Sequence, residues 1–246
     1  EVDQWHRAAA RARALPGPRR GRRSAPGPGQ LPQPPRPPVV EPDGTGSPYI
    51  GLRPYGPGDA PLFHGRSAET ATLLARLDAR RRRPLLVVGA SGSGKSSLVS
   101  AGLVPEWERR GLTTVIVRPG GIGPGVVDAP DALVVDQLEE LWADGVGRTE
   151  RAAALEHLAA RAASGLPTVC TLRSDFVTAA LAEPVLREAL DAEPVLLGPP
   201  SRAEITEIIV EPARSLGYVV EPALVTLLLD TVAPVGTGDD DRSLLP

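Results

Sequence analysis

The sequence predicts an α/β fold in which a mostly parallel sheet lies between two layers of helices. Short, wholly apolar runs recur along the chain and are typical of strands that are buried on both faces. Segments with helical periodicity separate these runs, as expected for parallel strands joined by helical crossovers. Hydrophobic residues make up 41% of the 246 residues, which is enough for a sizeable core. Because aromatic residues make up only 3%, that core must be aliphatic.

The first predicted elements follow one another closely in the globular part of the chain. The segment 68–83 places leucines on one face, which predicts a helix. The apolar run 85–88 predicts a strand that is buried on both faces. A second helix is expected over 96–110, with a break or a second start at Pro105. The β-branched run 113–117 predicts the next strand.

The later elements continue the alternation after one irregular connection. The segment 118–131 is rich in Pro and Gly and leaves no room for a full helix, although a parallel crossover needs about a dozen residues. The run 132–135 predicts another buried strand. The remaining expected strands span 168–172 and 195–197, and the remaining expected helices span 150–163, 177–190 with an interruption at Pro184, 202–215 and 222–232.

Composition also separates the chain into parts. Residues 1–15 are expected to be the tail of a missing N-terminal domain, and the proline-rich residues 16–48 are expected to form a disordered linker. Residues 49–197 form the predicted α/β core, and 198–246 begin a further helical part. The sequence contains no Met, even at position 1, so a fragment of a longer protein is expected.

Charge, hydropathy and cysteine usage exclude several classes of protein. The formal net charge of −3 argues against a chain built throughout as a nucleic-acid-binding surface. No apolar run approaches the roughly 18 residues that span a bilayer, and no signal-peptide pattern is present. The single cysteine, Cys170, rules out an internal disulfide framework and is expected to be a small core residue. These features favour a cytoplasmic location without a membrane span.

The strongest signal is a glycine-rich segment that directly follows the strand 85–88. It consists of Gly89, Ala90, Ser91, Gly92, Ser93, Gly94, Lys95 and Ser96, and matches the phosphate-loop pattern G-x-x-x-x-G-K-[ST]. The three glycines are expected to adopt backbone conformations closed to other residues, so that successive N–H groups surround phosphate oxygens. The helix that follows adds its free N–H donors and its dipole. The alternative is a Gly- and Ser-rich turn that binds no ligand.

Two side chains of this segment have specific expected roles. Lys95, the one lysine among 27 basic residues, is expected to reach the β- and γ-phosphates of a nucleotide. The hydroxyl of Ser96 is expected to bind Mg²⁺. The pattern therefore predicts a P-loop NTPase fold with three layers, αβα.

Carboxylates after the third predicted strand complete the expected site. Asp136 directly follows that strand, so it is expected at the carboxyl edge of the sheet, where it would hold the Mg²⁺ with Ser96. Hydrolysis needs a base that orients water, which Gln137 cannot be. Glu139 or Glu140 is the candidate catalytic residue, with a slight preference for Glu140. The alternative is that both are solvated carboxylates at the start of a helix.

Arg173 ends another predicted strand. An arginine at this edge could sense the γ-phosphate and report its loss. The alternative is a surface ion pair.

Four segments match the patterns of one family. Residues 47–66 resemble N-P-Y-x-G-L followed by F-x-G-R, 87–98 carry the phosphate loop, 133–142 resemble V-V-D-Q-F-E-E-L-F, and 171–176 resemble T-L-R-x-D-F. With these segments, residues 47–246 resemble the bacterial novel STAND NTPases, which are signal-transduction ATPases with numerous domains, related to AAA+, NACHT and apoptotic ATPases.

The resemblance implies a set of functional properties. It implies that Phe63, Gly65 and Arg66 lie near the adenine base, that the residues from Gly89 to Ser97 bind the nucleotide, and that 198–246 begin a helical lid. It also implies a regulatory switch with ADP in an off state, ATP in an on state and slow Mg²⁺-dependent hydrolysis. Further domains of the same chain are implied, namely sensor repeats and an N-terminal effector or helix-turn-helix domain, as is oligomerisation in the ATP state. No segment resembles a guanine-reading N-K-x-D, which favours ATP over GTP.

Two departures from the family pattern leave alternatives open. The crossover after Arg118 is short, and 234–243 are acidic where the family has a Gly-rich approach to a proline that contacts the nucleotide. One alternative is a degenerate scaffold that holds interaction domains together. The other is part of a DNA-binding transcriptional regulator, to which the basic cluster at 19–23 would contribute.

Overall fold

The sheet of this protein consists of five parallel strands in the order β2-β3-β4-β1-β5. The computed structural model describes residues 46–79, 82–128 and 130–232, so the predictions for 1–45 and 233–246 lie outside the described residues. The strands are β1 (Leu85–Gly89), β2 (Thr114–Val117), β3 (Ala132–Val135), β4 (Thr168–Arg173) and β5 (Val195–Leu197). Each agrees with a predicted strand to within one residue at either end, and the predicted α/β class is confirmed.

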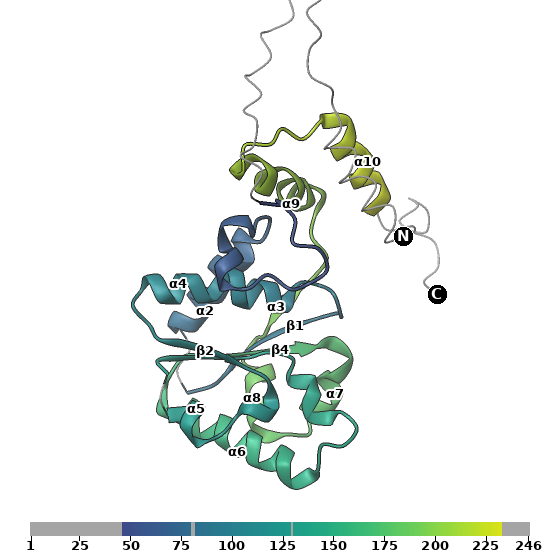
Figure 1. Ribbon diagram of the computed structural model, residues 1–246. Coiled ribbons are helices and arrows are strands. Elements are labelled where there is room, and N and C mark those ends of the chain that lie inside the picture. Colours follow the sequence, from purple (N-terminus) through teal and green to yellow (C-terminus); the bar gives the residue numbers. More distant parts are fainter. Residues whose placement is uncertain (1–45, 80–81, 129, 233–246) are drawn as a thin grey trace, which may run out of the picture. The chain divides into compact units, whose positions relative to one another are not determined.

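Helices cover both faces of the sheet, as Figure 1 shows. On one side lie α2 (Ser67–Ala79), α3 (Lys95–Ser97), η2 (Leu98–Leu103) and α4 (Val104–Arg109). On the other side lie α5 (Pro124–Asp128), α6 (Arg148–Ser164), α7 (Val177–Ala180) and α8 (Pro184–Asp191). Short 3₁₀ turns complete the core at η1 (Pro57–Leu62), η3 (Pro119–Gly121), η4 (Leu138–Trp142) and η5 (Ser174–Phe176).

The two core clusters follow from the alternation of side chains along the strands. Leu85 and Val87 of β1 belong to the cluster under α2 and α4, which includes the buried Trp107. Leu86 and Val88 belong to the opposite cluster, which packs against α6 and α8. Because both faces are covered, the central strands can be wholly apolar.

Two helices depart from the regular helices that the periodicity predicts. The predicted helix 68–83 is wrong at its end, because α2 spans Ser67–Ala79 and Arg82 has a left-handed φ of 69°. In the helix after the phosphate loop, η2 is a π-helix in which the N–H of Val104 donates to the carbonyl of Val99. The widened turn directly precedes Pro105, which has no N–H to continue an α-helical ladder.

The short connection between β2 and β3 does close a parallel crossover. It contains η3 and the five-residue helix α5, and Ile122 between them is buried in the core. Val117 pairs with Val135 in the resulting register. A 3₁₀ turn and a five-residue helix are therefore sufficient to connect the parallel strands β2 and β3.

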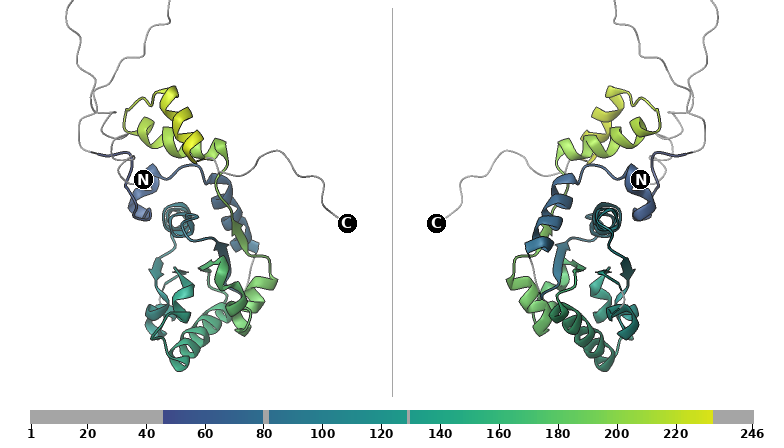
Figure 2. Two further views of the ribbon diagram at one scale, coloured as in Figure 1. Left: turned by 90° about the vertical axis from the view of Figure 1, so that its right-hand side faces the viewer. Right: turned by 90° about the vertical axis from the view of Figure 1, so that its left-hand side faces the viewer.

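Two further helices follow the sheet, and their bounds agree with prediction. Helix α9 (Arg202–Ser215) begins with a capping box, in which Ser201 and Glu204 exchange hydrogen bonds, and α10 (Pro222–Val232) follows it. Helix α9 contacts the beginning of the described chain, where the hydroxyl of Tyr49 donates to the carbonyl of Ile209 at 2.7 Å. Figure 2 shows α9 and α10 in two further views. None of the helices in the described ranges is long and apolar enough to cross a bilayer.

Arg161 of α6 joins that helix to the amino edge of the sheet. Its side chain is 1% exposed and donates to the carbonyl of Pro130 at 3.0 Å and to the hydroxyl of Thr168 at 3.1 Å. These acceptors lie at the amino ends of β3 and β4. Replacing the guanidinium with an apolar group would leave buried acceptors unsatisfied.

We expect Arg161→Leu to lower the free energy of unfolding by about 2–4 kcal/mol, because buried polar groups lose their partners. Urea unfolding followed by circular dichroism measures this difference. Arg148→Leu, at an exposed position of the same helix, is the control and should change it by less than about 0.5 kcal/mol. Equal effects of the two substitutions would contradict a structural role for Arg161.

Candidate functional site: a phosphate loop at the carboxyl edge of the sheet

The glycine-rich loop runs from the end of β1 to the start of α3. Gly92 and Gly94 have φ values of 75° and 91°, which L side chains rarely adopt. Gly89 is different, because its φ is not positive. A Cβ at Gly89 would lie 2.6 Å from the carbonyl oxygen of Leu197 and 2.8 Å from Oγ of Ser93. The predicted unusual backbone conformation is thus confirmed at Gly92 and Gly94. Gly89 requires glycine for a different reason, because no space is left for a Cβ.

Lys95 lies at the beginning of α3 and is 7% exposed. Its Nζ donates to the carbonyl of Gly89 at 2.9 Å and to that of Ala90 at 2.7 Å. Burial lowers the pKa of Lys95, and the negative charge of Glu139 opposes this shift. The ammonium group is therefore held over the loop by the loop's own carbonyls.

The rest of the loop supplies further polar groups. Oγ of Ser93 is buried and has no hydrogen-bond partner within the described part of the chain. Oγ of Ser97 accepts from the N–H of Tyr55 at 3.2 Å, which joins the loop's helix to the segment before η1. Ser91 and Ala90 are exposed on the loop.

Asp136 lies directly after β3 and is 7% exposed. Its Oδ1 accepts two hydrogen bonds, one from the hydroxyl of Ser96 at 2.9 Å and one from the hydroxyl of Thr171 at 2.7 Å. Its N–H donates to the carbonyl of Val117 at 2.8 Å. The structure thus brings together Ser96 and Asp136, the two residues predicted to hold Mg²⁺.

The donor set of Ser96 and Asp136 fits Mg²⁺. Proteins bind this ion through one or two carboxylates together with substrate phosphates and water, rather than through an all-protein cage. Accordingly, the described residues contain no group of three or more His, Cys, Asp and Glu side chains arranged to hold a metal.

Thr171 was not among the residues predicted from the sequence. It lies on β4 and is fully buried, and its hydroxyl also accepts from the N–H of Gln137 at 2.8 Å. The available signals were its hydroxyl between the apolar Cys170 and Leu172, and its place at the start of the segment 171–176 that resembles T-L-R-x-D-F.

The two candidate glutamates lie on η4 and face different neighbours. Glu139 Oε2 accepts from the N–H of Arg173 at 3.3 Å, and its charge acts on Lys95. Glu140 instead forms an ion pair with Arg118, which follows β2 and also donates to the side chain of Gln137. The geometry favours Glu139 over Glu140 as the carboxylate at the phosphate loop.

Arg173 ends β4 and pairs in register with Gly89 at the start of the loop. Its guanidinium donates to both carboxylate oxygens of Asp175, at 3.0 and 2.6 Å, and lies 5.4 Å from the ring centroid of Phe176. The Arg173 side chain lowers the pKa of Asp175 through these hydrogen bonds. The predicted position beside the loop and the alternative surface ion pair are both present in the structure.

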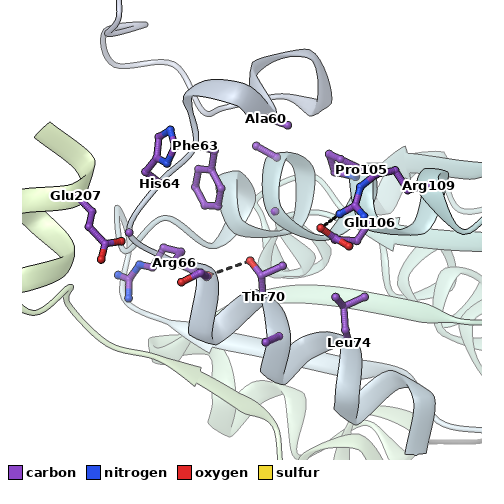
Figure 3. Close-up of a pocket in the computed structure, with 15 residues that line it drawn as sticks. Ala60, Phe63, His64, Arg66, Thr70, Leu74, Pro105, Glu106, Arg109 and Glu207 are labelled. Atoms are coloured by element: carbon purple, nitrogen blue, oxygen red, sulfur yellow. Dashed lines mark hydrogen bonds and ion pairs between the residues drawn. The ribbon is translucent and has the colours of Figure 1, made fainter. Parts of the chain in front are cut away.

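Phe63, Gly65 and Arg66 lie before α2 and line a separate pocket of about 480 Å³. Figure 3 shows Phe63, Arg66 and Glu207 toward one end of this pocket and the Glu106–Arg109 pair toward the other. No residue from 89 to 97 lines it. The three residues predicted near the base are thus together, and the pocket that they share does not include the phosphate loop.

Arg66 nevertheless connects the two regions. Its guanidinium is buried, pairs with Glu69, donates to the carbonyl of Gly198 at 2.9 Å and approaches that of Ser93 at 3.5 Å. Gly65 has a φ of 74°, and a Cβ there would lie 2.5 Å from the carbonyl oxygen of Glu204 on α9. This Gly-Arg pair therefore contacts the loop, the end of β5 and α9.

Comparison with known proteins gives a family and a fold. The family model described as novel STAND NTPase 1 matches residues 48–125 and 124–246. The AMPPCP-bound DnaA structure from Aquifex aeolicus is 16% identical, with a TM-score of 0.52, over 74% of this chain and 62% of that one. The structure of replication initiator DnaA bound to AMPPCP and single-stranded DNA is 16% identical, with a TM-score of 0.50, over 75% and 62%. The chain thus matches less than two thirds of the length of each structure, and at this identity the likeness shows the fold. No curated protein matches the sequence.

We expect Gly89→Ala to lower the free energy of unfolding by about 1–3 kcal/mol, because its Cβ would overlap the backbone of β5. Chemical unfolding measures this change. Gly58→Ala is the matched control, since a Cβ there meets no atom within 4 Å, and it should have an effect of less than about 1 kcal/mol. If Gly89→Ala were as stable as the control, the close approach of β5 would not be what requires glycine.

Proposed function

The chain belongs to the novel STAND NTPase 1 family of nucleotide-binding NTPases, and from this we propose that it is a regulatory switch module that binds ATP or ADP with Mg²⁺ and hydrolyses ATP slowly. The observation that carries the proposal is the juxtaposition of Lys95 with the Ser96–Asp136 pair at the carboxyl edge of β1 and β3. A lysine and a hydroxyl–carboxylate pair at this edge are the groups that phosphate and Mg²⁺ require.

The residues from Gly89 to Ser97 bind the phosphates in this proposal. The N–H groups of the loop and of the first turn of α3 surround the phosphate oxygens. Lys95 exchanges its bonds to the carbonyls of Gly89 and Ala90 for bonds to the β- and γ-phosphates. Ser96 and Asp136 hold Mg²⁺, which when bound neutralises charge on those phosphates.

Glu139 acts as the general base in this proposal. Its carboxylate orients the attacking water and accepts a proton as ADP and phosphate form. Arg173 is assigned to sense the γ-phosphate. It lies beside Gly89, the first residue of the loop, in the register of β1 and β4. Glu140 stays in its ion pair with Arg118 and fixes the turn that carries Glu139.

The adenine base is assigned to Phe63, Gly65 and Arg66, because Arg66 approaches the carbonyl of Ser93 in the loop, although the pocket that the three residues share does not include the loop. Helices α9 and α10 are assigned to the beginning of the helical lid. Arg66 supports a switch, because its guanidinium contacts carbonyls of both the phosphate loop and the segment that leads to α9. A change at the γ-phosphate would reach α9 through these bonds.

The module is proposed to work within a multidomain signalling protein. Its partners are sensor repeats and an N-terminal effector or helix-turn-helix domain of the same chain, and the ATP state is proposed to oligomerise. The single Cys170 is buried, and burial raises the pKa of its thiol to about 12. A cytoplasmic location is proposed from the scarcity of cysteine in the sequence.

We expect Lys95→Ala to weaken binding of ATP-Mg²⁺ and ADP-Mg²⁺ by about 10- to 100-fold, since a charge-assisted hydrogen bond contributes about 1.5–3 kcal/mol. Isothermal titration calorimetry of the purified chain measures both affinities. Arg110→Ala, at an exposed position after α4 and outside the lining of the pocket assigned to the adenine base, is the control and should bind as the wild type does. A folded wild-type chain that binds neither nucleotide would replace the switch with the scaffold alternative.

We expect Glu139→Gln to lower the ATP hydrolysis rate by about 100-fold or more, with nucleotide affinity retained, because general-base catalysis contributes about 10²–10⁴-fold. Glu140→Gln should lower the rate by less than about fivefold in the same phosphate-release assay, because this carboxylate contacts Arg118. A larger effect at Glu140 would reverse the two assignments.

A further inference from the structure

We infer that Thr171 is a positioning residue, whose hydroxyl fixes the Asp136 carboxylate and the turn that carries Glu139 for Mg²⁺-dependent nucleotide binding. This inference rests on the proposed function, because it concerns the residues assigned there to Mg²⁺. Its basis is a hydrogen-bond relay between two neighbouring strands at the edge of the sheet.

The register of the sheet brings the two residues together. Val135 pairs with Cys170, so the next residue of each chain segment, Asp136 and Thr171, also lie side by side. Val134 and Val169 belong to the core cluster under the helices that follow the phosphate loop, whereas Val135 and Cys170 belong to the opposite cluster. Since side chains alternate along a strand, Asp136 and Thr171 point to the face that α3 covers.

The hydroxyl of Thr171 uses both its donor and an acceptor site. It donates to Asp136 Oδ1 at 2.7 Å and accepts from the N–H of Gln137 at 2.8 Å. Both contacts lie within the normal range of hydrogen-bond lengths. One atom of β4 therefore holds the carboxylate of Asp136 and the backbone of the residue after it.

This site would accept an apolar residue if only packing mattered. Thr171 is fully buried on β4 between the apolar residues Cys170 and Leu172, and Val has nearly the same shape. A buried hydroxyl is unfavourable unless it is hydrogen-bonded. The hydrogen bonds to Asp136 and Gln137 explain why a hydroxyl, rather than an apolar group, is tolerated at this buried position.

The relay restrains the metal-binding carboxylate and the turn at the same time. Ser96 and Thr171 donate to the same oxygen of Asp136, so the two donors fix the plane of the carboxylate from α3 and from β4. Gln137 has a left-handed φ of 60° and leads directly into η4, which carries Glu139. The bond to its N–H stabilises a conformation that a residue other than glycine seldom adopts. Partners of this kind, which orient a metal ligand, typically change metal affinity by about 10–100-fold when they are removed.

The test compares Thr171→Val, which removes the hydroxyl at constant shape, with Thr171→Ser, which keeps it. Thr168→Val is the matched control, because Thr168 is buried on the same strand at the opposite end and bonds to Arg161 instead. Calorimetric titration with ATP is carried out at a series of Mg²⁺ concentrations and in EDTA. The Mg²⁺ midpoint, which is the Mg²⁺ concentration at which the ATP affinity reaches half of its increase, reports how well the site binds the metal. The ATP affinity in EDTA reports the contribution of the phosphate loop without metal.

We expect Thr171→Val to raise the Mg²⁺ midpoint by about 10–100-fold, with the affinity in EDTA within about twofold of the wild type. Thr171→Ser should restore the midpoint to within about threefold, and Thr168→Val should leave it unchanged. An unchanged midpoint in Thr171→Val, or an equal change in Thr168→Val, would overturn the inference and leave the proposed function standing. A wild-type chain that binds no nucleotide would overturn both. If Thr171→Val does not fold, the comparison of Thr171→Ser with Thr171→Ala decides the same question.

Discussion

The parallel register of β1, β3 and β4 is the constraint on which the rest of this site depends. All three strands end at the same edge of the sheet, so the residues that close each strand meet there. Gly89 lies beside Arg173, and Asp136 lies beside Thr171. A slip of one residue would turn each side chain to the opposite face and remove Asp136 from the face that α3 covers. The alternation of β3 side chains between two separate core clusters opposes such a slip, because Val134 and Val135 each fill their own cluster.

The same constraint separates what the sequence could predict from what it could not. Local patterns were sufficient for the strands, for the phosphate loop and for the placement of Asp136 after a buried run. Thr171 was missed because its role comes from its partner on a neighbouring strand, and a single sequence does not display pairing. The need for glycine at 89 was attributed to its φ, whereas its cause is the carbonyl of Leu197, a contact distant in sequence. Likewise, the prediction slightly preferred Glu140, whereas the ion pair of Glu140 with Arg118 at the end of β2 favours Glu139.

Arg66 connects the phosphate loop with the segment that leads to α9. Its guanidinium is buried, so its donors need partners within the protein, and the chain supplies Glu69 and the carbonyl of Gly198 as well as the nearby carbonyl of Ser93. A displacement of the segment after β5 relative to the phosphate loop would therefore leave a buried charge without part of its hydrogen bonding. Gly65 adds a steric connection, because the space for a Cβ is taken by the backbone of α9. Under the proposed function, these two residues hold the lid in the position that the structure shows.

The choice of lysine at position 95 follows from the space and the acceptors around it. Arginine is preferred almost everywhere else in this chain, with one Lys among 27 basic residues. Lys95 is buried and reaches the carbonyls of Gly89 and Ala90 at 2.9 and 2.7 Å, which a compact ammonium with three donors can do at one point. A planar guanidinium needs more volume and fixes its donors in a fork, which would force apart the turn that Gly89 closes against β5. Under the proposed function, Lys95 exchanges these two hydrogen bonds for bonds to phosphate, so its contribution to affinity is the difference between the two sets of interactions.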